Sequence, residues 1–191
     1  MAEAQQSFVI RRAEKSEAGL IRDLRFASLL SFEMQGDPLK WLGAITAALP
    51  DVDADLIRDG RYFVAESGGE LIGGAGWSLL PLGFRADRLV EADGRAADLS
   101  LDAGAVLVRG FFLDPDGGRR AAAADLLAHV EADAACAGHE AAELVVPSSA
   151  EVLYRSLGFR PVRRLALRVD DGSLPLLQMR KRLPVRLKSA A

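Results

Sequence analysis

Apolar residues follow two different patterns along this chain. Short runs rich in β-branched and aromatic residues, typical of strands, alternate with segments whose apolar residues recur every three or four positions, as in helices. The first pattern predicts strands at residues 8–10, 62–65, 70–77, 105–113, 143–146, 161–169 and 174–183. The second predicts helices at residues 16–28, 38–49, 51–58, 119–136 and 148–157. The interleaved order predicts a mixed α/β sheet, and no glycine-rich dinucleotide fingerprint follows a strand.

Three further features of the sequence predict local structure. Gly110 interrupts the most apolar strand, and a glycine inside a strand often marks a bulge or a close backbone approach. Residues 85–104 hold five acidic and three arginine side chains and no aromatic residue. We interpret this segment as a surface loop between the third and fourth strands, with a lid over a substrate as the alternative. Ser16 has the residue type of a helix N-cap.

Length and composition limit the kind of protein. The chain has 191 residues, half of them apolar, which fits one domain over residues 1–191 with its core between about 8 and 183. The net charge of −3 argues against a general nucleic-acid binder. One cysteine, Cys136, and two histidines argue against a disulfide and a metal centre, and we expect Cys136 to be a buried or half-buried thiol. The polar N-terminus and the short uncharged runs predict a cytoplasmic protein without a membrane span.

The segment from Phe111 to Ala124 is the most informative one, because a buried strand there enters a glycine-containing loop and then a helix. Free N–H groups at a helix start, and the positive end of the helix dipole, favour an anion. Arg119 and Arg120 occupy the first turn, where cations cost up to about 1 kcal/mol unless an anion binds. The alanines that follow leave room for a phosphate. The alternative is an ordinary turn with two solvated arginines.

The same segment resembles a known family. Phe-Phe-Leu-Asp-Pro-Asp-Gly-Gly-Arg-Arg-Ala-Ala-Ala-Ala-Asp-Leu-Leu at 111–127 is similar to the acetyl-CoA loop of the GNAT superfamily of N-acetyltransferases, and Leu-Tyr-Arg-Ser-Leu-Gly-Phe at 153–159 to its late Tyr-x-x-x-Gly-Phe segment. The resemblance covers residues 8–183. It implies a mixed, mostly antiparallel sheet of about seven strands flanked by helices, with the fourth and fifth strands splayed apart.

The resemblance also implies a reaction. A GNAT enzyme moves an acetyl group from acetyl-CoA, its co-substrate, to a primary amine of a small molecule or protein by direct attack and without a metal. The backbone of Phe112 and Leu113 would bind the pantetheine arm, and Tyr154 would protonate the departing thiolate. The residues implied to hold the phosphates are Gly118, Arg119, Arg120, Ala121, Ala122, Ala123 and Ala124.

Several alternatives stay open at this stage. Gly118 and Ala121 stand where the family usually has Gln or Arg and Gly, so the alternative function is a degenerate acyl-CoA-binding or regulatory domain without turnover. Tyr154 has a core-packed tyrosine as its alternative. The general base is open among Glu33, Glu66 and Asp114. The acceptor amine is not readable, and a homodimer is left open.

The C-terminal part of the chain is basic. From Arg155 onward there are ten Lys or Arg and two Asp residues, a local charge of +8. We interpret these cations as a solvated sheet edge, because edge strands carry Lys and Arg against aggregation. An acidic partner, or the phosphates of CoA, is the alternative.

Overall fold

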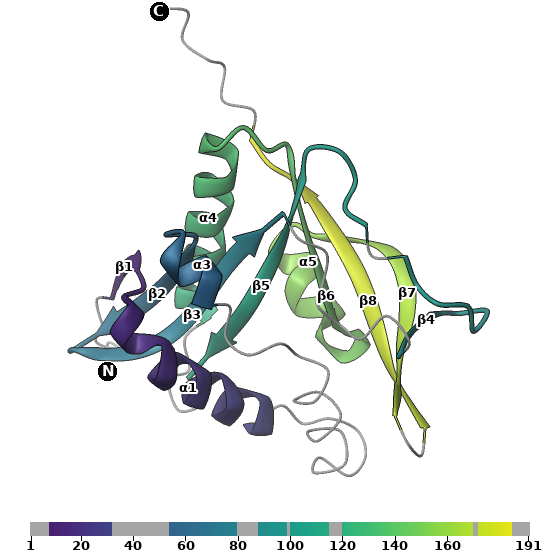
Figure 1. Ribbon diagram of the computed structural model, residues 1–191, viewed down its shortest axis with the longest axis horizontal. Helices are drawn as coiled ribbons and strands as arrows, with labels where there is room; N and C mark the ends of the chain where they lie inside the picture. Colours follow the sequence, from purple (N-terminus) through teal and green to yellow (C-terminus); the bar gives the residue numbers. More distant parts are fainter. Residues whose placement is uncertain are drawn as a thin grey trace, which may run out of the picture.

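A single eight-stranded sheet organises the chain (Figure 1). The computed structural model describes residues 8–31, 54–79, 88–98, 100–114, 120–169 and 172–184. The strands are β1 (Val9–Arg12), β2 (Tyr62–Ser67), β3 (Glu70–Ser78), β4 (Leu89–Glu91), β5 (Ala105–Leu113), β6 (Ala141–Pro147), β7 (Arg160–Val169) and β8 (Gly172–Arg182). They lie in the order β1-β2-β3-β5-β6-β8-β7-β4. Among the described strands, β5 and β6 form the parallel pair and the other neighbours are antiparallel.

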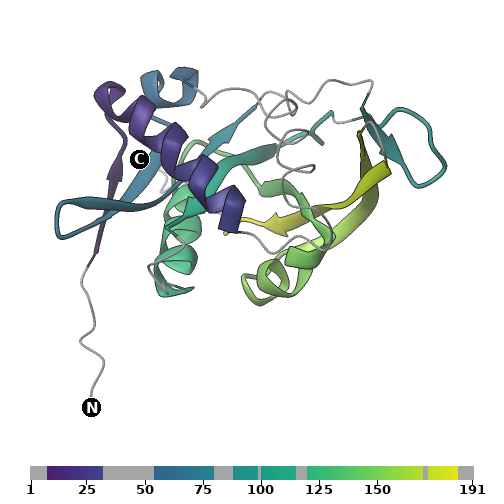
Figure 2. The ribbon, with the colours of Figure 1, turned by 90° about the horizontal axis from the view of Figure 1, so that it is seen from below.

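Helices cover both faces of this sheet (Figure 2). They are α1 (Ala18–Ser31), α3 (Ala54–Arg58), α4 (Arg120–Cys136) and α5 (Glu151–Ser156), with 3-10 turns η1 (Lys15–Glu17) and η3 (Ser148–Ala150). α1 and α3 lie on one face, and α4 and α5 on the other. Successive side chains of β2 point to opposite faces of the sheet, and both faces are covered. Tyr62 and Val64 belong to the apolar cluster under α1 and α3 (the α1/α3 cluster), whereas Phe63 belongs to the cluster under α4 and α5 (the α4/α5 cluster).

The predicted fold class is confirmed, and the sheet contains one strand more than expected. β4 lies inside the segment 85–104, which the sequence predicted as a loop, and pairs with β7 at the sheet edge. Leu89 and Val90 of this strand are buried. The strand is only three residues long, so its partner in β7 defines it rather than its own sequence pattern.

Two local predictions need correction, and a third concerns residues that the structure does not describe. Ser16 does not cap the first helix: it lies inside the 3-10 turn, whose N-cap is Glu14, and Glu17 accepts the Glu14 N–H at 2.7 Å. Cys136 is exposed rather than buried, because it is the last residue of α4 and follows the buried Ala134 and Ala135. The helix predicted at 38–49 lies outside the described residues.

Candidate active site between β5 and β6

β5 and β6 are hydrogen-bonded neighbours only over their first residues. The parallel register ends at Leu107 opposite Glu143. β5 then continues beside β3 and β6 continues beside β8, so the two strands separate, as Figure 1 shows. No other described strand pairs with either facing edge beyond this point. Buried backbone groups need hydrogen-bond partners, so these edges suit a ligand that carries amides of its own. We call this space the β5–β6 gap.

An extra residue in β5 accompanies the separation. Gly74 is opposite Phe112 and Gly76 is opposite Arg109, so β5 has one residue more than β3 between these pairs. Gly110 has a φ of +63°, in the region that favours glycine. The bulge expected at Gly110 is therefore confirmed. It also changes which face the following residues point to: Phe111 packs on the α4/α5 cluster, and Phe112 on the α1/α3 cluster.

Tyr154 lies where the two strands have separated. It belongs to α5, which follows β6, yet its ring centroid is 6.1 Å from that of Phe111 on β5. A second edge contact, also at 6.1 Å, joins it to Phe159. Only 6% of Tyr154 is exposed, and its hydroxyl has no hydrogen-bond partner among the residues the structure describes. Burial raises the pKa of this phenol above its usual 10, so the hydroxyl stays protonated and is available as a hydrogen-bond donor.

The start of α4 lies after the end of β5. Ala122 and Ala123 of its first turn are buried, and Ala122 packs on Ala65 and Ile72 of the sheet. Small side chains here keep the helix close to the strands, while its first N–H groups have no intrahelical acceptor. No acidic side chain occupies this turn. Ala124 is half-buried.

The remaining cofactor positions predicted from the sequence are less fully described. Phe112 and Leu113 form the last two pairs of β5 with β3, which places their backbone at the wide end of the gap. Arg120 and Ala121 belong to α4, and their side chains lie outside the description. Gly118 and Arg119 lie outside the described residues entirely.

The three carboxylates left open as a base occupy different places. Glu66 is on β2, two strands away from β5, and pairs with Arg11 at 2.6 Å. This ion pair and this position remove Glu66 from the gap. Asp114 directly follows β5, and its N–H donates to the carbonyl oxygen of Ile72. Glu33 lies outside the described residues.

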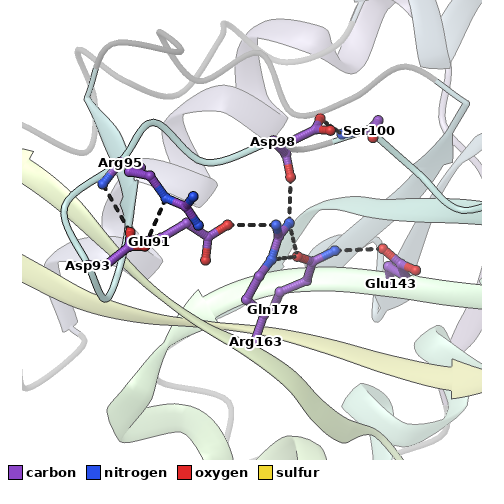
Figure 3. A network of polar contacts seen from close by, with 8 residues as sticks. All are labelled: Glu91, Asp93, Arg95, Asp98, Ser100, Glu143, Arg163 and Gln178. Atoms are coloured by element: carbon purple, nitrogen blue, oxygen red, sulfur yellow. Dashed lines mark hydrogen bonds and ion pairs between the residues drawn. The ribbon is translucent and has the colours of Figure 1, made fainter.

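A polar network (Figure 3) lies on the face of the sheet opposite the α4/α5 cluster, to which Tyr154 belongs. Leu144 and Val146 of β6 point to the α4/α5 cluster, so Glu143 between β5 and β8 points the other way. Its carboxylate accepts hydrogen bonds from Gln178 at 2.8 Å and Arg180 at 3.0 Å. Glu143 is only 2% exposed, and it has two hydrogen-bond donors at the closed end of the gap, where β5 and β6 are still paired.

The network extends to the sheet edge through Arg163 of β7. This guanidinium donates to Gln178, to Glu91 of β4 at 2.7 Å and to the backbone carbonyl of Asp98. Arg180 pairs with Asp102 as well as with Glu143. These basic residues are therefore not a purely solvated edge, since they fix the segment around β4 to the sheet.

One residue in contact with the β5 bulge was not singled out from the sequence. Tyr62 begins β2, and its hydroxyl donates a 2.7 Å hydrogen bond to the carbonyl oxygen of Gly110 in the bulge. A tyrosine at the start of a strand resembles any core aromatic residue. The glycines at 74 and 76 of β3 are the sequence signal that could have indicated it, because a Cβ atom at either position would lie within 3 Å of the Tyr62 side chain.

Comparison with known proteins identifies the fold. No protein-family model and no curated protein sequence match the chain. A solved GCN5-related N-acetyltransferase from Rhodopseudomonas palustris matches with a TM-score of 0.61 at 14% identity, over 96% of this chain and 100% of that one. A GNAT superfamily phosphinothricin acetyltransferase from Sinorhizobium meliloti, in complex with acetyl-CoA, matches with a TM-score of 0.59 at 17% identity, over 96% and 92%. This chain has the GNAT fold.

The GNAT fold is shared by proteins with different acceptors. The ribosomal-protein-S18-alanine N-acetyltransferase of Escherichia coli also matches, with a TM-score of 0.56 at 13% identity over 97% of this chain and 99% of that one. An alanine of ribosomal protein S18 and phosphinothricin are thus both named as acceptors in proteins with this fold. The fold alone therefore does not determine the acceptor.

The described residues contain neither a metal-ligand cluster nor a membrane-spanning helix. No group of three or more His, Cys, Asp or Glu side chains within those ranges is arranged to hold a metal ion. No helix there combines the length and the apolar character that crossing a membrane requires.

Proposed function

We propose that this protein is an N-acetyltransferase that moves the acetyl group of acetyl-CoA to a primary amine. The observation that carries the proposal is the β5–β6 gap with the buried Tyr154 hydroxyl beside it. Two facing strand edges without a strand partner suit the amides of a pantetheine arm. The N-terminus of α4, which lacks acidic side chains, suits the diphosphate. The GNAT fold of acetyl-CoA-bound neighbours supports the same assignment.

The chemistry follows from this arrangement. The amine nitrogen attacks the thioester carbonyl carbon, a C–N bond forms, and a β5 backbone N–H stabilises the developing negative oxygen. The C–S bond then breaks, and the thiolate of CoA takes the proton of the Tyr154 hydroxyl. The nitrogen releases a proton to solvent, from which Tyr154 is protonated again. The products are an N-acetylated amine and free CoA.

Tyr154→Phe tests this role. The variant removes one oxygen from a buried ring and keeps the contacts with Phe111 and Phe159. We expect kcat to fall at least about 100-fold, the usual contribution of general acid catalysis, while the affinity for CoA changes less than about twofold, because the hydroxyl acts on the leaving group. Thiol release from acetyl-CoA with a panel of amines measures the first quantity, and titration calorimetry with CoA the second.

The pH dependence supplies an internal control. Since burial raises the Tyr154 pKa above its ordinary 10, the acid remains protonated at alkaline pH, and wild-type kcat should not decline through Tyr154 ionisation below pH 10. An equal kcat for Tyr154→Phe contradicts the acid role. Binding of CoA by the wild type without turnover of any amine favours the degenerate acyl-CoA-binding domain instead.

A further inference from the structure

Tyr62 reaches across a neighbouring strand to the bulge of β5. β3 lies between β2 and β5, and the tyrosine ring passes over two of its glycines. A Cβ atom on Gly74 would lie 2.9 Å from the Tyr62 hydroxyl oxygen, and one on Gly76 would lie 2.7 Å from Tyr62 Cδ2. Glycine at both positions therefore leaves space for a ring that is 1% exposed. Its hydroxyl ends 2.7 Å from the Gly110 carbonyl oxygen.

This hydrogen bond supplies a donor to the carbonyl of the bulged residue. A bulge disrupts the ladder locally and leaves the extra residue unpaired, and a buried carbonyl without a donor is unfavourable. Because a peptide unit is planar, a partner fixed on the Gly110 oxygen also fixes the direction of the Phe111 N–H. Contacts then run from Tyr62 through Gly110 and Phe111 to Tyr154.

We propose that Tyr62 is a positioning residue of this acetyltransferase. Its hydroxyl holds the Gly110 peptide in the bulged arrangement, and through Phe111 it orients Tyr154 beside the gap. The inference rests on the proposed function, and deepens it by adding a residue that acts through β5. Tyr62 belongs to the apolar cluster on the α1/α3 face, whereas Tyr154 belongs to the cluster on the other face.

The test is Tyr62→Phe, which removes the hydroxyl and keeps the ring. We expect kcat to fall at least about fivefold, the equilibrium factor of one ordinary buried hydrogen bond, with the KM for acetyl-CoA changed less than about twofold. Amide hydrogen exchange in β5 should accelerate by a similar factor. Ser78→Ala is the control for the loss of a buried hydroxyl as such: Ser78 lies opposite Leu107, before the bulge, and the variant should leave kcat unchanged.

A double variant separates positioning from general destabilisation. If Tyr62 acts through Tyr154, the combined Tyr62→Phe and Tyr154→Phe variant should lose less kcat than the product of the two single losses. Faster amide exchange in β5 with an unchanged kcat assigns Tyr62 a structural role only and overturns the inference. The inference is also overturned if the kcat loss of the double variant equals the product of the two single losses.

The failure of this inference differs from the failure of the proposed function. A wild-type protein without turnover of any amine refutes both. If the wild type acetylates an amine, and Tyr154→Phe abolishes this turnover while Tyr62→Phe leaves it intact, only the positioning role is refuted.

Discussion

Gly110→Ala is the substitution for which the structure gives the sharpest expectation. A non-glycine residue in the left-handed region costs about 1–2 kcal/mol, and Gly110 has a φ of +63°. The new Cβ would also lie 2.8 Å from Tyr62 Cε2, and forcing an extra methyl group into a packed site costs about 1–3 kcal/mol. Together these effects lower the free energy of unfolding by about 3 kcal/mol, or roughly 6–12 °C in Tm for a chain of this length.

Gly68→Ala separates backbone strain from steric contact. Gly68 has a φ of +60°, nearly that of Gly110, but nothing lies within 4 Å of a Cβ built on it. This control should lose only the strain contribution, about 1–2 kcal/mol. Denaturant unfolding of both variants measures the difference, which we expect to be about 2 kcal/mol.

The same pair of variants tests the link between the bulge and the gap. Gly110→Ala should also weaken CoA binding, because relieving the contact with Tyr62 moves the β5 backbone, whereas Gly68→Ala should bind CoA as the wild type does. Calorimetric titration at a temperature where both variants are folded provides the measurement. Equal destabilisation of the two variants, with unchanged CoA affinity in both, would refute the steric reasoning.

Two further predictions concern ion pairs. Glu143→Ala removes the buried acceptor that Gln178 and Arg180 share, while Arg180 keeps its pair with the exposed Asp102, and the variant should cost about 3 kcal/mol. Arg155→Ala, which breaks an exposed pair with Glu151, should cost under about 0.5 kcal/mol. Denaturant unfolding compares the two variants, and equal losses would contradict the assignment. Hydrogen bonding from Arg11 lowers the pKa of Glu17 below its ordinary 4.5, so its stabilisation is present above pH 4.5 and is lost as the pH falls through the lowered value. The stability difference between wild type and Glu17→Gln should therefore shrink in acid, and a constant difference would exclude this linkage.

Elements with a strong local pattern could be predicted from the sequence. The run at 105–113 predicted β5, and Gly110 within it predicted the bulge. The helix predicted at 119–136 is α4, and the apolar residues that recur in it at helical spacing are buried: Ala123, Leu126, Leu127, Val130 and Ala134. In these elements the period of the apolar residues and the local glycine chemistry agree with the tertiary structure.

Features that depend on distant partners could not be predicted in this way. β4 has three residues and exists through its pairing with β7 and the hydrogen bond of Arg163 to Glu91. Arg163 itself looked like a surface cation, because nothing near it in sequence indicates Gln178 or Glu91 as a partner. Tyr62 and Gly110 are 48 positions apart, so the bond that caps the bulge requires the strand order to be known first.

Two buried polar groups near the gap differ in a way that indicates where a ligand belongs. Glu143, at the closed end, has hydrogen bonds from both Gln178 and Arg180. Tyr154, where the strands have separated, has no partner for its hydroxyl among the described residues. Buried polar groups in folded proteins are nearly always paired, and leaving one unpaired costs about 1–3 kcal/mol. Within the described part of the chain, the first group is paired and the second is not, so the Tyr154 hydroxyl remains a hydrogen-bond donor for a ligand in the gap, which is where the thioester sulfur lies under the proposed function.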